Sequence, residues 1–470
     1  MNRKIWLSGI FLVESLILYF LITDRFPVSG DDYSYLYQAK LFAAGKLWAE
    51  NPLYDVSNPS HDCIVTNNLA DYHGHRFSKY PPGWPILLAV GSVLKVPWLV
   101  DPLLGVLLVF LMTAYVEREM GDRLVNVTWL LLLSCLFFVY YAATQRAHIA
   151  TALFIFGAFL AFQASEQRPE KRRYWLFIAG ALLGYSVMTR YIDWVPLGAW
   201  IGIGLLWRAK FRELAAFTAG FAVLAAGNPI YHTLLFGHPF PAVSDVVGWQ
   251  GPGTTMADRL IVSPMGFVRT GIRLANLIWV FPPTLLLALF CTRHNASSKT
   301  KMYLALFTMN VGIYFFYPAA TGGSGPRYFL AYFPFLVLAV VDLYRQIRAD
   351  GPPWAFRLWT LSLIALVVGN LVFALVETYT MYRRQDLDRT AQRLGPGQKV
   401  FLLKTGTYHT DARDLTRNPP ELLMAENLYL NWCNNPERDA LLKQFPGRKV
   451  FVYEYPSHLF PYVPNGNSSM

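Results

Sequence analysis

Long apolar runs recur along this chain and constrain its fold more than any other feature. Residues 101–116 and 357–378 are two examples, and a run of about 18 apolar residues is long enough to cross a bilayer as a helix. Charged residues make up only 15% of the 470 residues, against about 25% in soluble domains. The sequence therefore predicts an all-α polytopic membrane protein.

The first apolar run, Ile5 to Ile22, follows Arg3 and Lys4 and resembles the start of a secretory signal. It is too long for a signal core, and no small-x-small cleavage site follows it. We interpret it as an uncleaved anchor with a cytoplasmic N-terminus.

The segment from Pro82 to Pro97 leaves two topologies open, a short crossing or a re-entrant helix. A full crossing would place the basic cluster at 166–173 outside, whereas a re-entrant helix places every basic connector inside. The tendency of Lys and Arg to stay on the cytoplasmic side favours the second topology. It gives eleven crossings, with the chain end outside: 5–22, 101–116, 124–143, 147–164, 174–190, 193–207, 213–235, 272–291, 302–318, 328–344 and 357–378.

Two domains are expected from the change in composition after Thr378. Residues 1–378 form the transmembrane module, and its first outer loop at 24–100 carries juxtamembrane helices. Residues 379–470 contain candidate strands at 400–403 and 450–453 and a helix-like stretch at 435–444, which predicts a small extracytoplasmic α/β domain. Cys63 and Cys433 both fall on the outer side, but the sequence does not show whether they pair.

Several function classes lack support. The net charge of +11 comes from short connectors between apolar runs, and no nucleic-acid motif accompanies it. No glycine-rich strand-turn-helix fingerprint for a nucleotide is present. The four cysteines have no metal-type spacing, so no metal site is expected.

In the same topology several polar residues lie on the outer face, where we expect the reaction to take place. Arg146 and His148 lie between two spans, and an isolated histidine favours a hydrogen-bonded role over metal ligation. Arg190 and Asp193 lie at a span boundary, and their spacing also suits a pair with each other. These four residues are second-tier candidates for an outer cavity, together with Tyr35 and Tyr328.

Asp31 and Asp32 are adjacent acids directly after the first span, with three tyrosines close behind. Helix capping or solvent exposure is the simpler interpretation. A carboxylate at the membrane boundary is also suited to act as a general base for a hydroxyl group. The N-terminus of a short surface helix over 32–46 would keep Asp31 ionised.

Two cationic residues, Lys79 and Arg327, lie where the chain comes back to the outer membrane face. Lys79 precedes Tyr80-Pro81-Pro82, which is typical of a snorkelling lysine beside an interfacial tyrosine, or of a rigid turn that holds the ammonium over a lipid phosphate. Arg327 follows a glycine-rich turn, and its guanidinium fork suits phosphate oxygens.

These motifs resemble the GT-C superfamily of multispanning glycosyltransferases, which includes protein O-mannosyltransferases and bacterial enzymes that add aminoarabinose to lipid A. Asp31-Asp32-x-x-Tyr35 is similar to the family's acidic pair and tyrosine, with Asp in place of the more usual Glu at the second position. Lys79-Tyr80-Pro81-Pro82-Gly83 and Gly325-Pro326-Arg327-Tyr328 are similar to its other two motifs. The departure at Asp32 leaves open which carboxylate is catalytic.

The resemblance implies an inverting sugar transfer at the outer face from a polyprenyl-phosphate donor. It implies Asp31 as the base and Lys79 and Arg327 as phosphate contacts, with Tyr80 beside them. The expected partners are the lipid-linked donor, a glycan, lipid or protein acceptor, and membrane lipids, with no cofactor. A bacterial inner membrane is the expected location. The alternatives are a transporter or flippase of a lipid-linked substrate, or an envelope assembly subunit.

Overall fold

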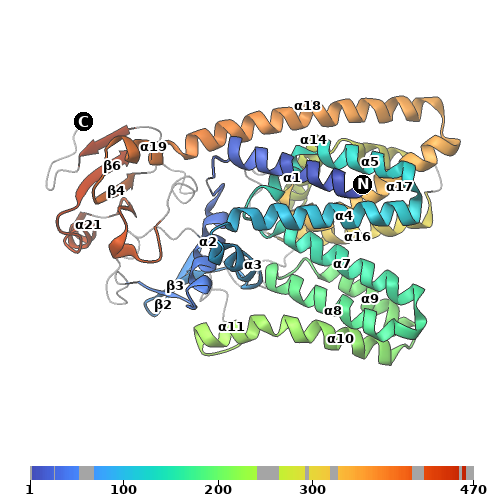
Figure 1. The fold of residues 1–470 in the computed structure, drawn as a ribbon, viewed down its shortest axis with the longest axis horizontal. Helices are drawn as coiled ribbons and strands as arrows, with labels where there is room; N and C mark the ends of the chain where they lie inside the picture. The colour runs from blue at the N-terminus through green and yellow to red at the C-terminus, as the bar shows by residue number, and fades with distance from the viewer. Residues whose placement is uncertain are drawn as a thin grey trace.

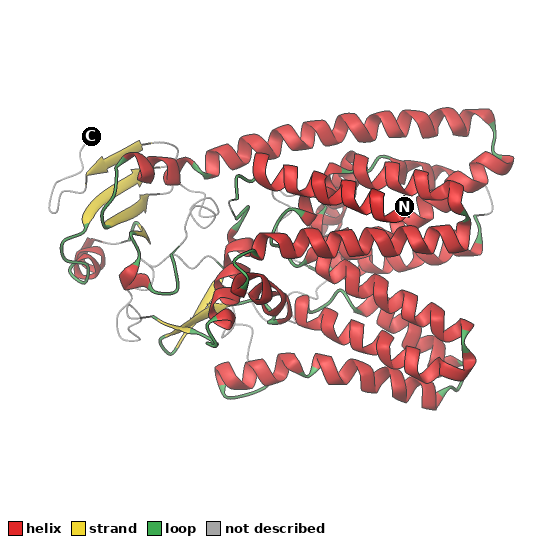
Figure 2. Ribbon diagram, in the orientation of Figure 1, coloured by secondary structure: helices red, strands yellow, loops and turns green. Residues whose placement is uncertain are grey.

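The computed structural model describes most of the chain, and Figure 1 shows its path. The described residues are 3–25, 27–51, 68–240, 264–291, 296–317, 326–404, 418–433, 435–454 and 458–461. Most of the expected outer segment 236–271 and the glycine-rich turn before Arg327 lie outside them. Among the described residues, the strands lie toward the end of the molecule that carries the C-terminal domain, and most of the remaining described residues are helical (Figure 2).

A bundle of antiparallel helices forms the body of the protein. Its described helices are α1 (Arg3–Leu21), α4 (Val100–Met120), α5 (Asp122–Ser134), α6 (Leu136–Ala142), α7 (His148–Gln167), α8 (Arg172–Thr189), α9 (Val195–Trp207), α10 (Phe211–Ala225), α11 (Gly227–Phe236), α14 (Pro264–Val280), α15 (Pro283–Cys291), α16 (Ser298–Phe315), α17 (Phe333–Asp350) and α18 (Pro353–Arg384). Short 3-10 turns lie at Pro97–Leu99 (η2), Pro169–Lys171 (η3), Arg327–Tyr332 (η4) and Leu422–Met424 (η5).

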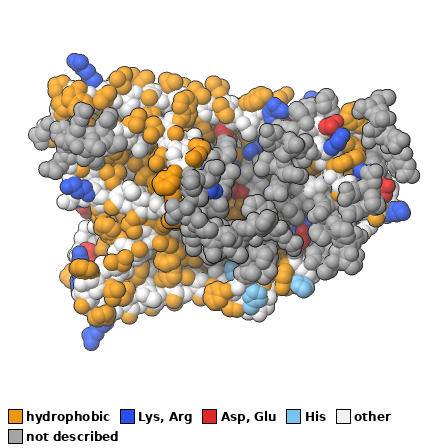
Figure 3. All heavy atoms as spheres, turned by 180° about the vertical axis from the view of Figure 1, so that it is seen from behind, with side chains coloured by type: hydrophobic (Ala, Val, Ile, Leu, Met, Phe, Trp, Pro, Cys, Tyr) orange, Lys and Arg blue, Asp and Glu red, His pale blue; other side chains and the backbone are white. Residues whose placement is uncertain are grey.

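The surface of the bundle is apolar in the way that lipid contact requires. Six described helices are long and apolar enough to cross a membrane, or seven if the bent pair α5 and α6 is one span. The other expected spans are helices that are shorter, less apolar or interrupted, so eleven crossings stays a prediction. Many hydrophobic side chains, and few charged ones, lie on the helical part of the face in Figure 3. The protein is an integral membrane protein.

Ion pairs show which helix ends lie together. Lys4 at the start of α1 and Lys299 at the start of α16 both bind acids at the end of α4, Glu117 and Glu119. Arg208 after α9 binds Glu166 near the end of α7. The basic connectors therefore gather at the bundle end away from the C-terminal domain, while α2 and α3 lie at the opposite end (Figure 1).

The first outer segment builds a small platform at that opposite end. It contains α2 (Gly30–Ala43), α3 (Gly83–Val93) and strands β1 (Ala49–Glu50), β2 (Leu69–Tyr72) and β3 (His75–Ser78) in the antiparallel order β1-β3-β2. With 11 residues, α3 is too short to cross a bilayer. The sequence did not predict the β2–β3 hairpin, whose two loop residues, His73 and Gly74, both have positive φ.

The C-terminal region is an α/β unit that follows the long helix α18. Its elements are α19 (Asp386–Arg393), β4 (Lys399–Lys404), β5 (Asn427–Asn431), α21 (Asn435–Leu442), β6 (Lys449–Glu454) and β7 (His458–Pro461). Strand β4 is parallel to both β5 and β6, and β7 is antiparallel to β6. One face of the sheet packs on α21 and the other on α19. Cys433 is in a disulfide bond, and Cys63 lies outside the described residues.

Candidate functional site

The two adjacent aspartates of α2 lie in different environments. Asp32 is fully buried, and its Oδ2 accepts hydrogen bonds from Ser29 Oγ at 2.6 Å and Arg146 Nε at 3.1 Å. Its Oδ1 accepts from the backbone N–H of Gln145 at 3.1 Å. Asp32 therefore fixes the connection between α6 and α7, which carries Arg146 to the site.

Asp31 keeps 20% of its side chain exposed. Its Oδ1 accepts hydrogen bonds from Asn68 Nδ2 at 2.7 Å and from the Tyr80 hydroxyl. The Oδ1 of Asn68 in turn accepts from Lys79 Nζ. Asn68 has a φ of +57°, a conformation that Asn tolerates better than most residues. It thereby links the predicted base to the predicted phosphate-binding lysine.

Arg327 approaches the second oxygen of the same carboxylate. Its Nη1 lies 3.5 Å from Asp31 Oδ2, which is longer than a typical hydrogen-bonded ion pair. Burial disfavours the charged carboxylate, but Arg327, Arg146 and Lys79, with the Tyr80 hydroxyl, lower the pKa of Asp31 below its usual 3.8. Asp31 is therefore ionised at neutral pH. The structure thus brings together the three residues expected to carry the chemistry.

A second group of charges lies next to the first. Arg190 pairs with Asp193, and Arg190 Nη2 also donates to the Tyr314 hydroxyl at 2.8 Å. Arg190 Nη1 lies 3.1 Å from His148 Nε2. His148 and Asp193 are buried, with 4% and 1% exposure. Each second-tier candidate in this group therefore has a charged or polar partner.

Tyr328 connects the two groups through cation–π contacts. The guanidinium carbons of Arg327, Arg273 and Arg190 lie 5.2, 5.0 and 6.0 Å from the centre of its ring. Arg273 comes from α14 and donates to the backbone carbonyl oxygens of Tyr314 and Tyr317. Tyr328 thus holds three arginines from separate elements around one ring.

The contacts close into a ring. From Asp31 they pass to Arg327, Tyr328, Arg190 and His148 through the distances given above. The His148 ring then lies 5.2 Å from that of Tyr141.

Tyr141 provides the contacts that close this ring. Its hydroxyl accepts from Arg146 Nη1 at 2.8 Å, and Arg146 binds Asp32, the neighbour of Asp31 in sequence. We call these eight residues the contact ring: Asp31, Asp32, Tyr141, Arg146, His148, Arg190, Arg327 and Tyr328.

Sequence reasoning missed several contributors. Asn68, Tyr141, Arg273 and Tyr314 lie in segments far apart in the chain. Tyr141 and Tyr314 lie within apolar runs, where a tyrosine gives no distinguishing signal, but an arginine at position 273 within an expected span is a signal of function. Tyr35, a second-tier candidate, is 3% exposed and stacks on Tyr80 at 4.6 Å, so it supports the site from the core.

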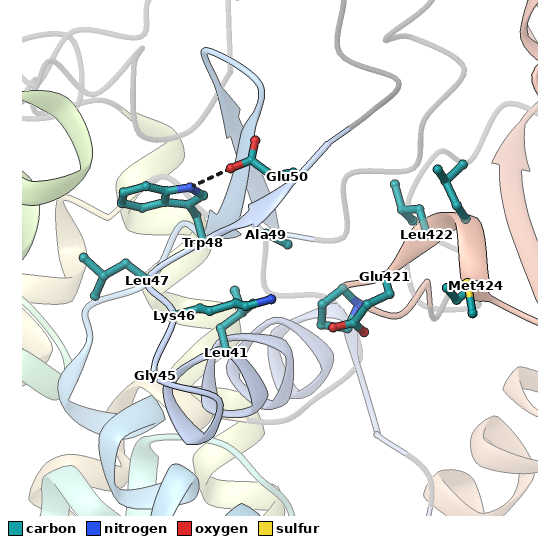
Figure 4. A pocket seen from close by; sticks show the side chains of 12 residues that line it. Leu41, Gly45, Lys46, Leu47, Trp48, Ala49, Glu50, Glu421, Leu422 and Met424 are labelled. Carbon is teal, nitrogen blue, oxygen red and sulfur yellow. Dashed lines mark hydrogen bonds between the residues drawn. The ribbon is translucent and has the colours of Figure 1, made fainter.

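A separate pocket lies between the end of α2 and the C-terminal domain, with a volume of about 700 Å³. Lys46 and Glu421 point toward each other across it, and Trp48 Nε1 donates to Glu50 at 3.2 Å (Figure 4). Its lining residues are Leu41, Gly45, Lys46, Leu47, Trp48, Ala49, Glu50, Pro420, Glu421, Leu422, Leu423 and Met424. None of them belongs to the contact ring.

Comparison with solved structures identifies the fold. Neither a protein-family model nor a curated protein matches this chain. The crystal structure of ArnT from Cupriavidus metallidurans bound to undecaprenyl phosphate aligns with a TM-score of 0.51 at 16% identity, over 97% of this chain and 94% of that chain. The chain has a GT-C fold. The sequence motifs had led us to expect this fold, and the likeness confirms it.

Other structures align with lower scores. ArnT in the apo state gives a TM-score of 0.49 at 16% identity, over 95% of this chain and 92% of that chain. AglB from Archaeoglobus fulgidus, in complex with an inhibitory peptide and a dolichol-phosphate, gives 0.44 at 12% identity, over 96% of this chain and 69% of that chain.

Proposed function

We propose that this GT-C protein is a glycosyltransferase that moves a sugar from a polyprenyl-phosphate donor to an acceptor hydroxyl, with inversion at the anomeric carbon. One observation carries the proposal: an ionised, partly exposed carboxylate, Asp31, lies beside two cations, Lys79 and Arg327. This is the combination that a hydroxyl nucleophile and a phosphate leaving group require.

The local charge suits such a donor. Lys79 and Arg327 contribute two positive charges against the one negative charge of Asp31. A polyprenyl-phosphate sugar is a phosphodiester with one negative charge, so its binding would neutralise this group. The ArnT structure of the same fold binds undecaprenyl phosphate, which supports this class of lipid.

The roles of individual atoms follow from the hydrogen bonds. Oδ1 of Asp31 already accepts two, so Oδ2 is the oxygen with capacity to take a proton. Oδ2 takes the acceptor hydroxyl proton while the hydroxyl oxygen bonds to the anomeric carbon. The bond from that carbon to the phosphate oxygen breaks, and the oxygen leaves with the electron pair toward Lys79 and Arg327. In this proposal the two cations neutralise the phosphate.

The proposal includes an orientation in the membrane. The end with the basic connectors is cytoplasmic, and the contact ring and the C-terminal domain lie on the outer side of a bacterial inner membrane. The donor then enters sideways from the bilayer, and the acceptor arrives from the outer aqueous side.

The test uses a photoreactive analogue of undecaprenyl phosphate with the purified full-length protein. Labelling of the wild type that falls several-fold in Lys79→Ala and Arg327→Ala is the expected result. Lys40→Ala is the matched control, because Lys40 is exposed on α2 outside the site and its loss should leave labelling unchanged. Labelling indifferent to Lys79 and Arg327 would contradict the phosphate site.

A transfer assay then tests the base. With undecaprenyl-phosphate sugars as donors and a cell-envelope extract as the acceptor source, Asp31→Asn should abolish sugar transfer while the lipid still labels the protein. Full turnover by the folded Asp31→Asn variant would remove the assigned base.

A further inference from the structure

Two buried hydrogen-bond donors in the contact ring have no described partner. Arg146 Nη2 and His148 Nδ1 are both inaccessible and unpaired, and the two residues are 0% and 4% exposed. They lie two positions apart: Arg146 is in the segment that joins α6 to α7, and His148 is the first residue of α7. Buried polar groups are nearly always hydrogen-bonded, so unpaired ones point to a missing partner such as a ligand.

The tautomer of His148 follows from its neighbour. A guanidinium has only donors, so Arg190 Nη1 donates to His148 Nε2, which must be the unprotonated nitrogen of a neutral ring. The hydrogen of the neutral imidazole is then on Nδ1. Both unpaired groups are therefore donors, and both need an acceptor.

Their position places them beside the proposed reaction centre. Both residues contact Tyr141, with the Arg146 guanidinium carbon 5.1 Å and the His148 ring 5.2 Å from the centre of its ring. Arg146 binds the neighbour of Asp31, and His148 reaches Arg327 through Arg190 and Tyr328. The sugar of a donor whose phosphate lies at Arg327 would thus be close to both groups.

The charge balance around Arg146 and His148 indicates which kind of chemical group they bind. Arg146 is balanced by Asp32 and Arg190 by Asp193, so neither arginine calls for an anion. Neutral oxygens with free lone pairs satisfy both donors.

We infer that Arg146 and His148 bind hydroxyl or ring oxygens of the donor sugar. The inference rests on the proposed function, because it assigns the sugar subsite of the same donor. The two residues hold the sugar while Asp31 acts on the acceptor, and no chemical step is added.

Two substitutions of His148 separate its two nitrogens. Asn places an amide N–H near the position of Nδ1 and lacks the group that faces Arg190, whereas Gln reaches the position of Nε2 and lacks the Nδ1 donor. Each variant is assayed for kcat/KM with undecaprenyl phosphate carrying a neutral hexose or pentose, and for affinity toward bare undecaprenyl phosphate.

We expect His148→Gln to lose about tenfold in kcat/KM, as the loss of one hydrogen bond predicts, and His148→Asn to lose less. Affinity for bare undecaprenyl phosphate should be unchanged in both. Equal activity of both variants and the wild type, or a larger loss in Asn than in Gln, would overturn the role of Nδ1.

A wild type that binds no undecaprenyl phosphate and transfers no sugar would instead overturn the proposed function, and the inference with it. The bare lipid therefore distinguishes the two failures.

Discussion

Replacing Asp32 by Asn should destabilise the fold, although Asp32 stands next to the proposed base. Asp32 and Arg146 are both 0% exposed and form a buried ion pair, and removing one partner of such a pair costs about 3–5 kcal/mol. Asn keeps one oxygen for the Gln145 N–H, so we expect about 3 kcal/mol, or roughly a hundredfold in the folding equilibrium.

Equilibrium unfolding in mixed detergent micelles, followed by circular dichroism, measures this loss. Asp31→Asn is the matched control, because Asp31 is 20% exposed and its contact with Arg327 is 3.5 Å long. The Asp31→Asn substitution should change the unfolding free energy by less than about 1 kcal/mol. An Asp32→Asn variant as stable as the wild type but inactive would refute this reasoning, and would give Asp32 a chemical role.

Three further predictions concern the base and the leaving group. Because the pKa of Asp31 is lowered below 3.8, the base is ionised above that value, and the transfer rate should stay level from pH 7 to about pH 5; a rate that halves near pH 6 would point to another base. Tyr80→Phe removes a hydrogen bond to Asp31 and should raise its pKa, so that the acid limb of the pH–rate profile moves upward while the protein stays folded; an unmoved limb would contradict the assigned bond. Lys79 and Arg327 are proposed to neutralise the phosphate, so EDTA should change the transfer rate by less than about twofold. If EDTA lowers the rate further and added divalent metal restores it, the enzyme requires a metal ion.

The sequence presented Asp31 and Asp32 as adjacent candidates but did not show which of them is buried. Successive residues of a helix point about 100° apart, so adjacent aspartates in one turn must face different surroundings. Which aspartate faces the core depends on what packs against α2, and that partner is the connection carrying Arg146, more than 100 positions away. The sequence therefore left both acids as candidates, and only the structure separated a buried Asp32 from an accessible Asp31.

The hairpin of the first outer segment shows a local signal that sequence reasoning overlooked. Gly74 favours a tight turn, and four-residue strands flank the pair His73-Gly74. Missing the hairpin also meant missing Asn68, which directly precedes β2. The side chain of Asn68 meets Asp31 only because the strand returns past the start of α2.

The sequence by itself determined the membrane class, the presence of several apolar helices and two of the described strands of the C-terminal unit, β4 and β6, because apolar runs and strand-forming residues are local properties that a short window contains. It also gave Asp31, Lys79 and Arg327 as candidate site residues, since charges beside apolar runs are conspicuous. Only the tertiary structure decided which charges pair, which donors stay unpaired and which tyrosines join the site. Those facts depend on contacts between residues tens to hundreds of positions apart, and such contacts exist only once the helices have packed.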